Sequence, residues 1–243
     1  MHYALVVGID CSAASASCCL LLGDKILAQS FVNAGLTHSR TLLPLIKSTL
    51  RSADKKLADV DCIAVSAGPG SFTGVRIGIA TVKGLCFTCD IPCVPVSTLE
   101  AIPQGLAGFS GYACAVMDAR CNQVYTATFE LDSGELGRLT EDRAVSIDDL
   151  AAELEPLDGP VWLCGDGGEL VYNRMLEIYH DKPNDFTGKI RLAPEPVRYQ
   201  TGYGVALAAR KYIQTGAIPA DELVPTYLRP PQAERELGRR KNY

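Results

Sequence analysis

The sequence contains few of the residues on which hydrolytic catalysis depends. Its 243 residues include only three histidines, His2, His38 and His180. A serine or cysteine nucleophile needs a base beside it, and the Gly-x-Ser-x-Gly motif that places a catalytic serine on a sharp turn does not occur. These absences argue against a serine hydrolase or a metalloprotease, so a peptidase stays only as a minor alternative.

Targeting and membrane signals are also missing. The N-terminal apolar run lacks a basic stretch before it and is interrupted by Asp10. A membrane-spanning helix would require a run of about 18 apolar residues, and no such run occurs. The ten cysteines are scattered through apolar runs, which is typical of small buried side chains in a reducing compartment. The sequence therefore predicts a soluble, cytoplasmic protein.

Two local features keep alternatives open. Cys86 and Cys89 form a Cys-x-x-Cys pair, and Cys93 follows it. A zinc site would need a second such pair or a nearby histidine, and neither is present. The pattern therefore favours core cysteines at a helix end over a zinc site. The net charge of −5 makes the chain a poor sole binder of nucleic acid. Basic residues gather only in the last nine positions, which favours a solvated tail over an RNA clamp; they are Arg235, Arg239, Arg240 and Lys241.

The order of the apolar segments predicts an α/β fold. Strand patterns, a hairpin turn at Gly23-Asp24 and intervening helical spacing alternate along the first part. The expected strands are 3–10, 16–22, 25–32, 61–66, 93–96, 112–117, 123–130 and 161–164. The expected helices are 38–52, 74–88, a short one near Ser97, 147–154, 168–179 and 201–214, with 181–200 as a loop. This pattern predicts an N-terminal lobe over 1–105 and a C-terminal lobe with an extended tail over 106–243.

The turn at residues 68–74 is the strongest local signal. It reads Gly-Pro-Gly-Ser-Phe-Thr-Gly between a buried strand and a helix, where free backbone amides can hold an anion. It matches neither a P-loop nor the dinucleotide-binding fingerprint. The alternative is that Ser71 or Thr73 simply caps the following helix. For Asp10, at the end of the first strand, the alternative is that its carboxylate caps a turn. The candidate phosphate-binding residues are Asp10, Ser12, Gly68, Gly70, Ser71, Thr73 and Gly74.

Six motifs together resemble the bacterial TsaB family, also called YeaZ. They lie at residues 8–12, 37–46, 64–78, 95–100, 117–120 and 225–229. The resemblance implies an actin-like ATPase fold, similar to that of Hsp70 and sugar kinases, with two lobes of which the second is reduced. It also implies a role in forming N6-threonylcarbamoyladenosine at adenosine 37 of tRNA.

The resemblance implies a helper rather than a catalyst. TsaD, the transferase paralogue, carries a metal-binding His-x-x-x-His whose two positions align with Thr98 and Ile102 here. An isoleucine cannot bind a metal and a threonine is a poor substitute for histidine. The family's role is to bind TsaD, together with the ATPase TsaE, with tRNA as the substrate of the complex. A stand-alone nucleotide-using enzyme of the same fold is the other alternative.

The helix at 74–88 is apolar on almost every side, which predicts burial on all sides, either in the domain or beneath a partner. We therefore expect this helix and the one at 38–52 to contact TsaD, or a second copy of the chain when TsaD is absent. The candidate partner-binding residues are Leu42, Leu45, Ile46, Val75, Arg76, Ile79 and Val82. No cofactor is expected on the isolated chain, although ATP or ADP could sit at the joint surface.

Overall fold

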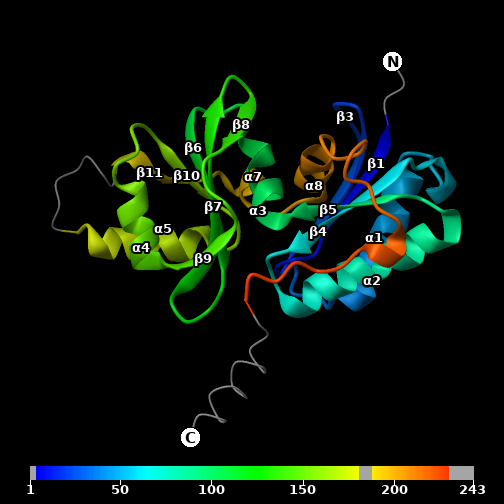
Figure 1. Cartoon of the computed structure of the whole chain (residues 1–243), viewed down its shortest axis with the longest axis horizontal. Coiled ribbons are helices and arrows are strands. Elements are labelled where there is room, and N and C mark those ends of the chain that lie inside the picture. Colours follow the sequence, from blue (N-terminus) through cyan, green and yellow to red (C-terminus); the bar gives the residue numbers. More distant parts are fainter. Residues whose placement is uncertain (1–3, 181–187, 230–243) are drawn as a thin grey trace, which may run out of the picture.

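The computed structural model describes residues 4–180 and 188–229 as two sheets lying side by side, each covered by helices (Figure 1). The basic tail at 235–241, like His2, lies outside the described residues. The first sheet has the strand order β3-β2-β1-β4-β5. Its strands are β1 Leu5–Asp10, β2 Ala16–Leu22, β3 Lys25–Val32, β4 Cys62–Gly68 and β5 Cys93–Ser97, which confirms the five strands expected there.

The inner strands of the first sheet are buried on both faces, and alternate residues of each strand point into two different cores. Val7 and Ile9 face a core shared with helices α1 (His38–Ser52) and α2 (Phe72–Cys89). Val6 faces a second core, which helix α8 (Gly202–Ala209) fills. This two-sided cover explains why β1 and β4 are continuously apolar rather than alternating.

The second sheet follows the path β11-β10-β6-β7-β8, with β9 pairing β7. Helices α4 (Ile147–Leu154) and α5 (Gly168–Ile178) pack on one face. The short α3 (Thr98–Ala101) and the 3-10 helix η2 (Ile102–Leu106) pack on the other, between the lobes. The strands are β6 Gly111–Asp118, β7 Gln123–Asp132, β8 Glu135–Arg138, β9 Arg143–Ser146, β10 Val161–Cys164 and β11 Ile190–Leu192.

Short elements account for the differences from the expected pattern. The sequence pattern missed β8 and β9, whose four residues each are too few to establish a period. The prediction that 181–200 is a loop is wrong in its described part, because β11 and helix α7 (Glu195–Arg198) lie there. The helix expected over 201–214 ends at Ala209 and continues as turns.

The division at residue 105 needs a correction at the C-terminal end. Helix α8 packs against β1 and β2 of the first lobe. After it, Ile218 forms an antiparallel bridge with Cys93, and Leu223 is buried in the core beneath α1 and α2. The C-terminal segment therefore returns to the first lobe rather than belonging to a second lobe over 106–243.

Helix α2 is the one described helix that is long and apolar enough to cross a membrane by length and composition. One side of it packs on β4 and is buried, at Gly74, Val75, Gly78, Ile79, Val82 and Cys86. These contacts account for the apolar residues on that side only, and the expectation of burial on all sides is not met within the chain, because Phe87 and Ala80 are exposed.

Candidate functional site

Asp10 is fully buried at the end of β1. Its carboxylate accepts hydrogen bonds from the Ser12 amide at 3.1 Å, the Ser12 hydroxyl at 3.0 Å and the Ser66 hydroxyl. Burial raises the pKa of Asp10, and the hydrogen bonds from Ser66 and Ser12 only partly oppose this rise. The hydrogen bonds from Ser12 confirm the turn-capping alternative for Asp10, and its contact with a phosphate stays a prediction.

Ser71 is the N-cap of α2. Its side-chain oxygen accepts a hydrogen bond from the Gly74 amide at 3.2 Å, which confirms the capping alternative. The Ser71 amide itself donates to the Ser12 carbonyl at 2.6 Å. The amides of Ser12, Ser71 and Gly74 are therefore already bonded within the protein, which leaves fewer donors for an anion than the sequence suggested.

Close backbone packing explains the glycines of this turn. A Cβ atom on Gly68, whose φ is +124°, would lie 2.2 Å from the Thr226 carbonyl oxygen. One on Gly74 would lie 2.1 Å from the Cys11 carbonyl oxygen. Glycine is needed at both positions whether or not a ligand binds. Phosphate contact by Gly70 or by the exposed Thr73 stays a prediction.

A cleft of about 470 Å³ opens beside this turn, between the two lobes. Its charged lining consists of Asp118, Arg120, Asp166 and Arg229. Arg120 pairs with Asp118 at 3.0 Å, and Arg229 donates to Gln123. The cleft thus carries both signs of charge, and Arg120 and Asp118 pair with each other within it.

Asp166 is a residue of this cleft that the sequence reasoning missed. It follows β10, and its side chain is exposed in the cleft. Desolvation by the surrounding protein nevertheless raises its pKa to about 6, although the side-chain amide of Gln200 donates to the carboxylate at 2.5 Å. The neighbouring Asp118 and Asp10 also favour the protonated form. The signal that could have found it is the run Gly165-Asp-Gly-Gly168 directly after a buried strand.

We expect Asp166→Asn to stabilise the protein at neutral and alkaline pH. The folded-state pKa of about 6 exceeds the ordinary value of 3.8, so wild-type stability falls as pH rises from about 4 to about 6. The variant avoids that loss, which we expect to be about 1 kcal/mol or less, because the side chain is exposed and solvent screens its charge. Urea unfolding of both proteins at pH 8 and pH 4 measures the gain. An equal gain at both pH values would contradict the ionisation argument.

Most of the expected partner-binding residues are part of the protein's own core. Leu42, Ile46, Val75, Ile79 and Val82 are buried against the first sheet, so they offer no surface to a partner and that assignment is wrong for them. Leu45 is half-buried and Arg76 is exposed. The helical period was read correctly, but the apolar side of each helix faces inward.

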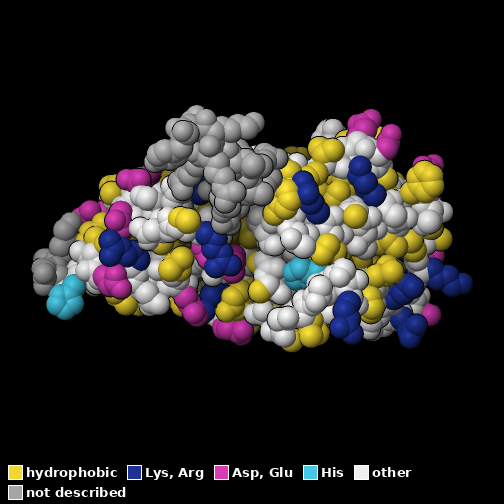
Figure 2. Space-filling view, turned by 90° about the horizontal axis from the view of Figure 1, so that it is seen from below, with side chains coloured by type: hydrophobic (Ala, Val, Ile, Leu, Met, Phe, Trp, Pro, Cys, Tyr) yellow, Lys and Arg dark blue, Asp and Glu magenta, His cyan; other side chains and the backbone are white. Residues whose placement is uncertain are grey.

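The surface that α1 and α2 do present is different. Its exposed members are Leu43, Pro44, Lys47 and Arg51 on α1 and Arg76, Ala80, Gly84 and Phe87 on α2, which we call the outer face. Phe87 is 87% exposed and Leu43 is 38% exposed. Figure 2 looks onto this side of the molecule, where yellow apolar side chains lie among dark-blue Lys and Arg side chains at the right. Exposed large apolar side chains of this kind mark contact surfaces.

Arg76 is tied to the returning C-terminal segment. Its guanidinium lies 3.6 Å from the centre of the Phe72 ring, and its Nε donates to the Tyr227 hydroxyl at 2.8 Å. Phe72 and Tyr227 stack with ring centres 5.0 Å apart. The side chain is thus held in place at the edge of the outer face, by residues that the sequence reasoning did not single out.

Comparison with known proteins identifies the family. Residues 32–161 match the family model described as TsaD, tRNA N6-adenosine threonylcarbamoyltransferase. The TsaB protein of Bacillus subtilis, named a tRNA threonylcarbamoyladenosine biosynthesis protein, is 33% identical over 71% of this chain and 75% of its own length. The chain belongs to the TsaB family.

Solved structures agree with this assignment. YeaZ from Pseudomonas aeruginosa is 25% identical, with a TM-score of 0.74 over 93% of this chain and 100% of its own. Component A of the (R)-2-hydroxyglutaryl-CoA dehydratase of Acidaminococcus fermentans shares the fold alone, with 14% identity, a TM-score of 0.52 and coverage of 87% of this chain and 100% of its own. The actin-like ATPase fold expected for a TsaB-family protein is confirmed.

In this TsaB-family chain, the positions aligned with the TsaD metal ligands lie inside the protein. Thr98 begins α3 and Ile102 begins η2, and both are buried. Ile102 packs with Leu99 and Leu106 in the core between the lobes. The Thr98 hydroxyl has no hydrogen-bond partner among the described residues. This environment does not fit a metal ion, because it offers one neutral oxygen in place of several ligands.

The cysteine pair also divides between core and surface. Cys86 is buried and Cys89 is exposed at the end of α2. Within residues 4–180 and 188–229, no group of three or more His, Cys, Asp or Glu side chains is arranged to hold a metal. The zinc alternative for Cys86 and Cys89 therefore gains no geometric support.

Proposed function

We propose that this chain is a non-catalytic subunit required for tRNA N6-threonylcarbamoyladenosine formation. It binds the TsaD transferase directly through its outer face and works with the TsaE ATPase through the resulting complex. The tRNA is a substrate of that complex rather than a ligand of this chain alone. The site of action is the cytoplasm.

The pathway follows from the family. Relatives that cover most of this chain are named for threonylcarbamoyladenosine biosynthesis, and more than half of the chain matches the transferase model itself. A subunit that shares its fold with the transferase can pack against it helix to helix, as two related lobes do in a pseudo-symmetric dimer.

The absence of catalysis is supported by the buried Thr98 and Ile102, the observation that carries the proposal. A peptidase gains no support, since the His38 Nε2 atom lies 2.8 Å from the Ala13 carbonyl oxygen and its Nδ1 has no hydrogen-bond partner in the described part of the chain. No described nucleophile is therefore placed against this base.

Nucleotide use by the isolated chain has little support, because Asp10 is enclosed and the amides of Ser12, Ser71 and Gly74 are bonded internally. We place any ATP or ADP at the surface shared with TsaD instead. Without TsaD, the exposed Phe87 of the outer face, which lies outside the basic part of that face, is expected to bring two copies together as a homodimer.

Calorimetry and a modification assay test the proposal. We expect no heat when ATP and Mg²⁺ are titrated into the isolated chain, and saturable binding when TsaD is titrated. TsaD with TsaE should modify tRNA only when this chain is present. Modification or ATP turnover by the chain alone would overturn the non-catalytic role, and failure to bind TsaD would overturn the partnership.

A further inference from the structure

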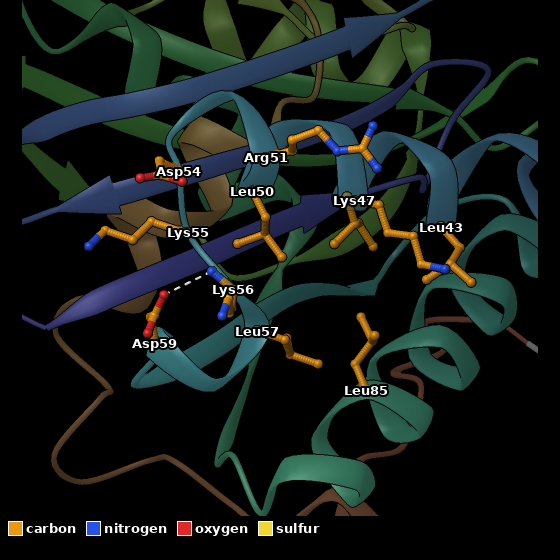
Figure 3. Close-up of a pocket in the computed structure, with 11 residues that line it drawn as sticks. Leu43, Lys47, Leu50, Arg51, Asp54, Lys55, Lys56, Leu57, Asp59 and Leu85 are labelled. Carbon is orange, nitrogen blue, oxygen red and sulfur yellow. Dashed lines mark hydrogen bonds between the residues drawn. The ribbon is translucent and has the colours of Figure 1, made fainter.

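A groove of about 710 Å³ runs between α1, the C-terminal half of α2 and the 3-10 helix η1 (Leu57–Asp59). Leu50 from α1, Leu57 from η1 and Leu85 from α2 point toward one another across it (Figure 3). Leu43 extends this apolar strip onto the outer face, where it is 38% exposed. The floor can therefore take up leucine-sized side chains.

Basic side chains border the groove. Lys47, Arg51, Lys55 and Lys56 all line it and are exposed. None of them forms an ion pair with another described residue. Two carboxylates, of Asp54 and Asp59, also line the groove. Asp59 is engaged, since it accepts a hydrogen bond from the Lys56 amide at 2.8 Å.

The four basic side chains around the groove are notable because the chain as a whole has a net charge of −5. Charges across an interface are arranged so that a positive patch meets a negative one. Four exposed cations beside an apolar floor are thus complementary to a segment that carries carboxylates on one side and apolar side chains on the other.

We propose that this groove binds an acidic segment of the docked TsaD, with carboxylates against Lys47, Arg51, Lys55 and Lys56 and at least one leucine-sized side chain on the floor. The inference rests on the proposed function and adds to it the chemistry of the partner segment. The cations steer and align the partner, and the leucines supply the buried area.

A protein segment fits this groove better than RNA or a second copy does. The apolar floor of Leu50, Leu57 and Leu85 gives no interaction with phosphates, and Asp54 would repel them. A second copy of this chain would bring an equally basic groove, so an isologous contact centred here would place like charges together.

Charge reversal tests the inference. Lys47→Glu and Arg51→Glu are each expected to weaken TsaD binding, and the double variant by about tenfold or more. The wild-type affinity should fall with added salt, and the double variant should lose most of that dependence. Lys25→Glu, an equal charge change on exposed β3 outside the groove, should leave affinity unchanged. Carbodiimide coupling of the wild-type complex should join Lys47, Lys55 or Lys56 to carboxylates within one TsaD segment.

The outcomes separate the two proposals. If TsaD binds but the double variant binds it equally well and no coupling occurs at these lysines, the groove inference is wrong and the proposed function stands. If TsaD does not bind at all, both fall. Loss of tRNA binding or of self-association in the double variant, with TsaD binding unchanged, would assign the groove to RNA or to a second copy and overturn the inference.

Discussion

Phe87→Glu is expected to weaken the complex with TsaD by about a hundredfold or more while leaving the chain folded. The side chain is 87% exposed on the outer face, so a carboxylate there remains hydrated in the free chain. In the complex the same carboxylate would lose its water without gaining a hydrogen-bond partner. Replacing an aromatic side chain at the centre of an interface commonly costs this much binding affinity. Calorimetric titration with TsaD measures the affinity, and urea unfolding checks that stability is kept.

Two variants serve as controls. Leu170→Glu changes an exposed side chain on α5, on the other lobe, and should bind TsaD normally. Phe87→Leu keeps an apolar side chain and should bind with an intermediate affinity. Co-elution of folded Phe87→Glu with TsaD at wild-type affinity would show that the outer face of α2 is not the interface. Ile79→Glu is uninformative here, since it would introduce a charge into the core.

Gly8→Ala is expected to lower the free energy of unfolding by about 3 kcal/mol or more. The new methyl group would collide with backbone atoms, which cannot move aside as the end of a side chain can. The added Cβ atom would lie 2.0 Å from the Gly202 carbonyl oxygen and 2.7 Å from the Ala206 amide nitrogen. The substitution therefore forces α8 away from β1 and opens the core between them. Urea unfolding measures the loss.

Gly84→Ala is the matched control for this effect. Gly84 is exposed on α2 and nothing lies within 4 Å of the position of an added Cβ atom. The same substitution should here stabilise the protein by about 0.5–1 kcal/mol, because alanine loses less backbone entropy than glycine in a helix. A loss at Gly84 as large as at Gly8 would show that close packing is not the cause.

The regular elements of the first lobe could be predicted because their apolar residues follow clear periods. The three opening strands, α1 and the hairpin at Gly23-Asp24 lie where the pattern put them. The second lobe was harder, because β8, β9 and β11 are short, and β9 and β11 pair with strands about 20 or more residues away. Nothing local in the sequence specifies that α8 returns to the first sheet.

The site was predicted less well, for reasons that a one-dimensional pattern cannot resolve. A helix such as α2, apolar all round, does not show which side faces the sheet, so Val75, Ile79 and Val82 were assigned to a partner although they contact β4 and its neighbours. Phe87 was recognisable only as one more apolar residue. Asp166 acquires its raised pKa from desolvation by parts of the chain that are distant in the sequence, although its side chain is exposed in the cleft.

The return of α8 to the first lobe has a consequence for how the chain emerges from the ribosome. One side of the five-stranded sheet, including Val6, Cys19 and Ala64, is covered by residues of α8 that are synthesised more than a hundred positions later. Until then this apolar side is open, so the nascent N-terminal lobe cannot complete its core by itself. Chaperone contact and truncation before Gly202 should both act on that uncovered surface.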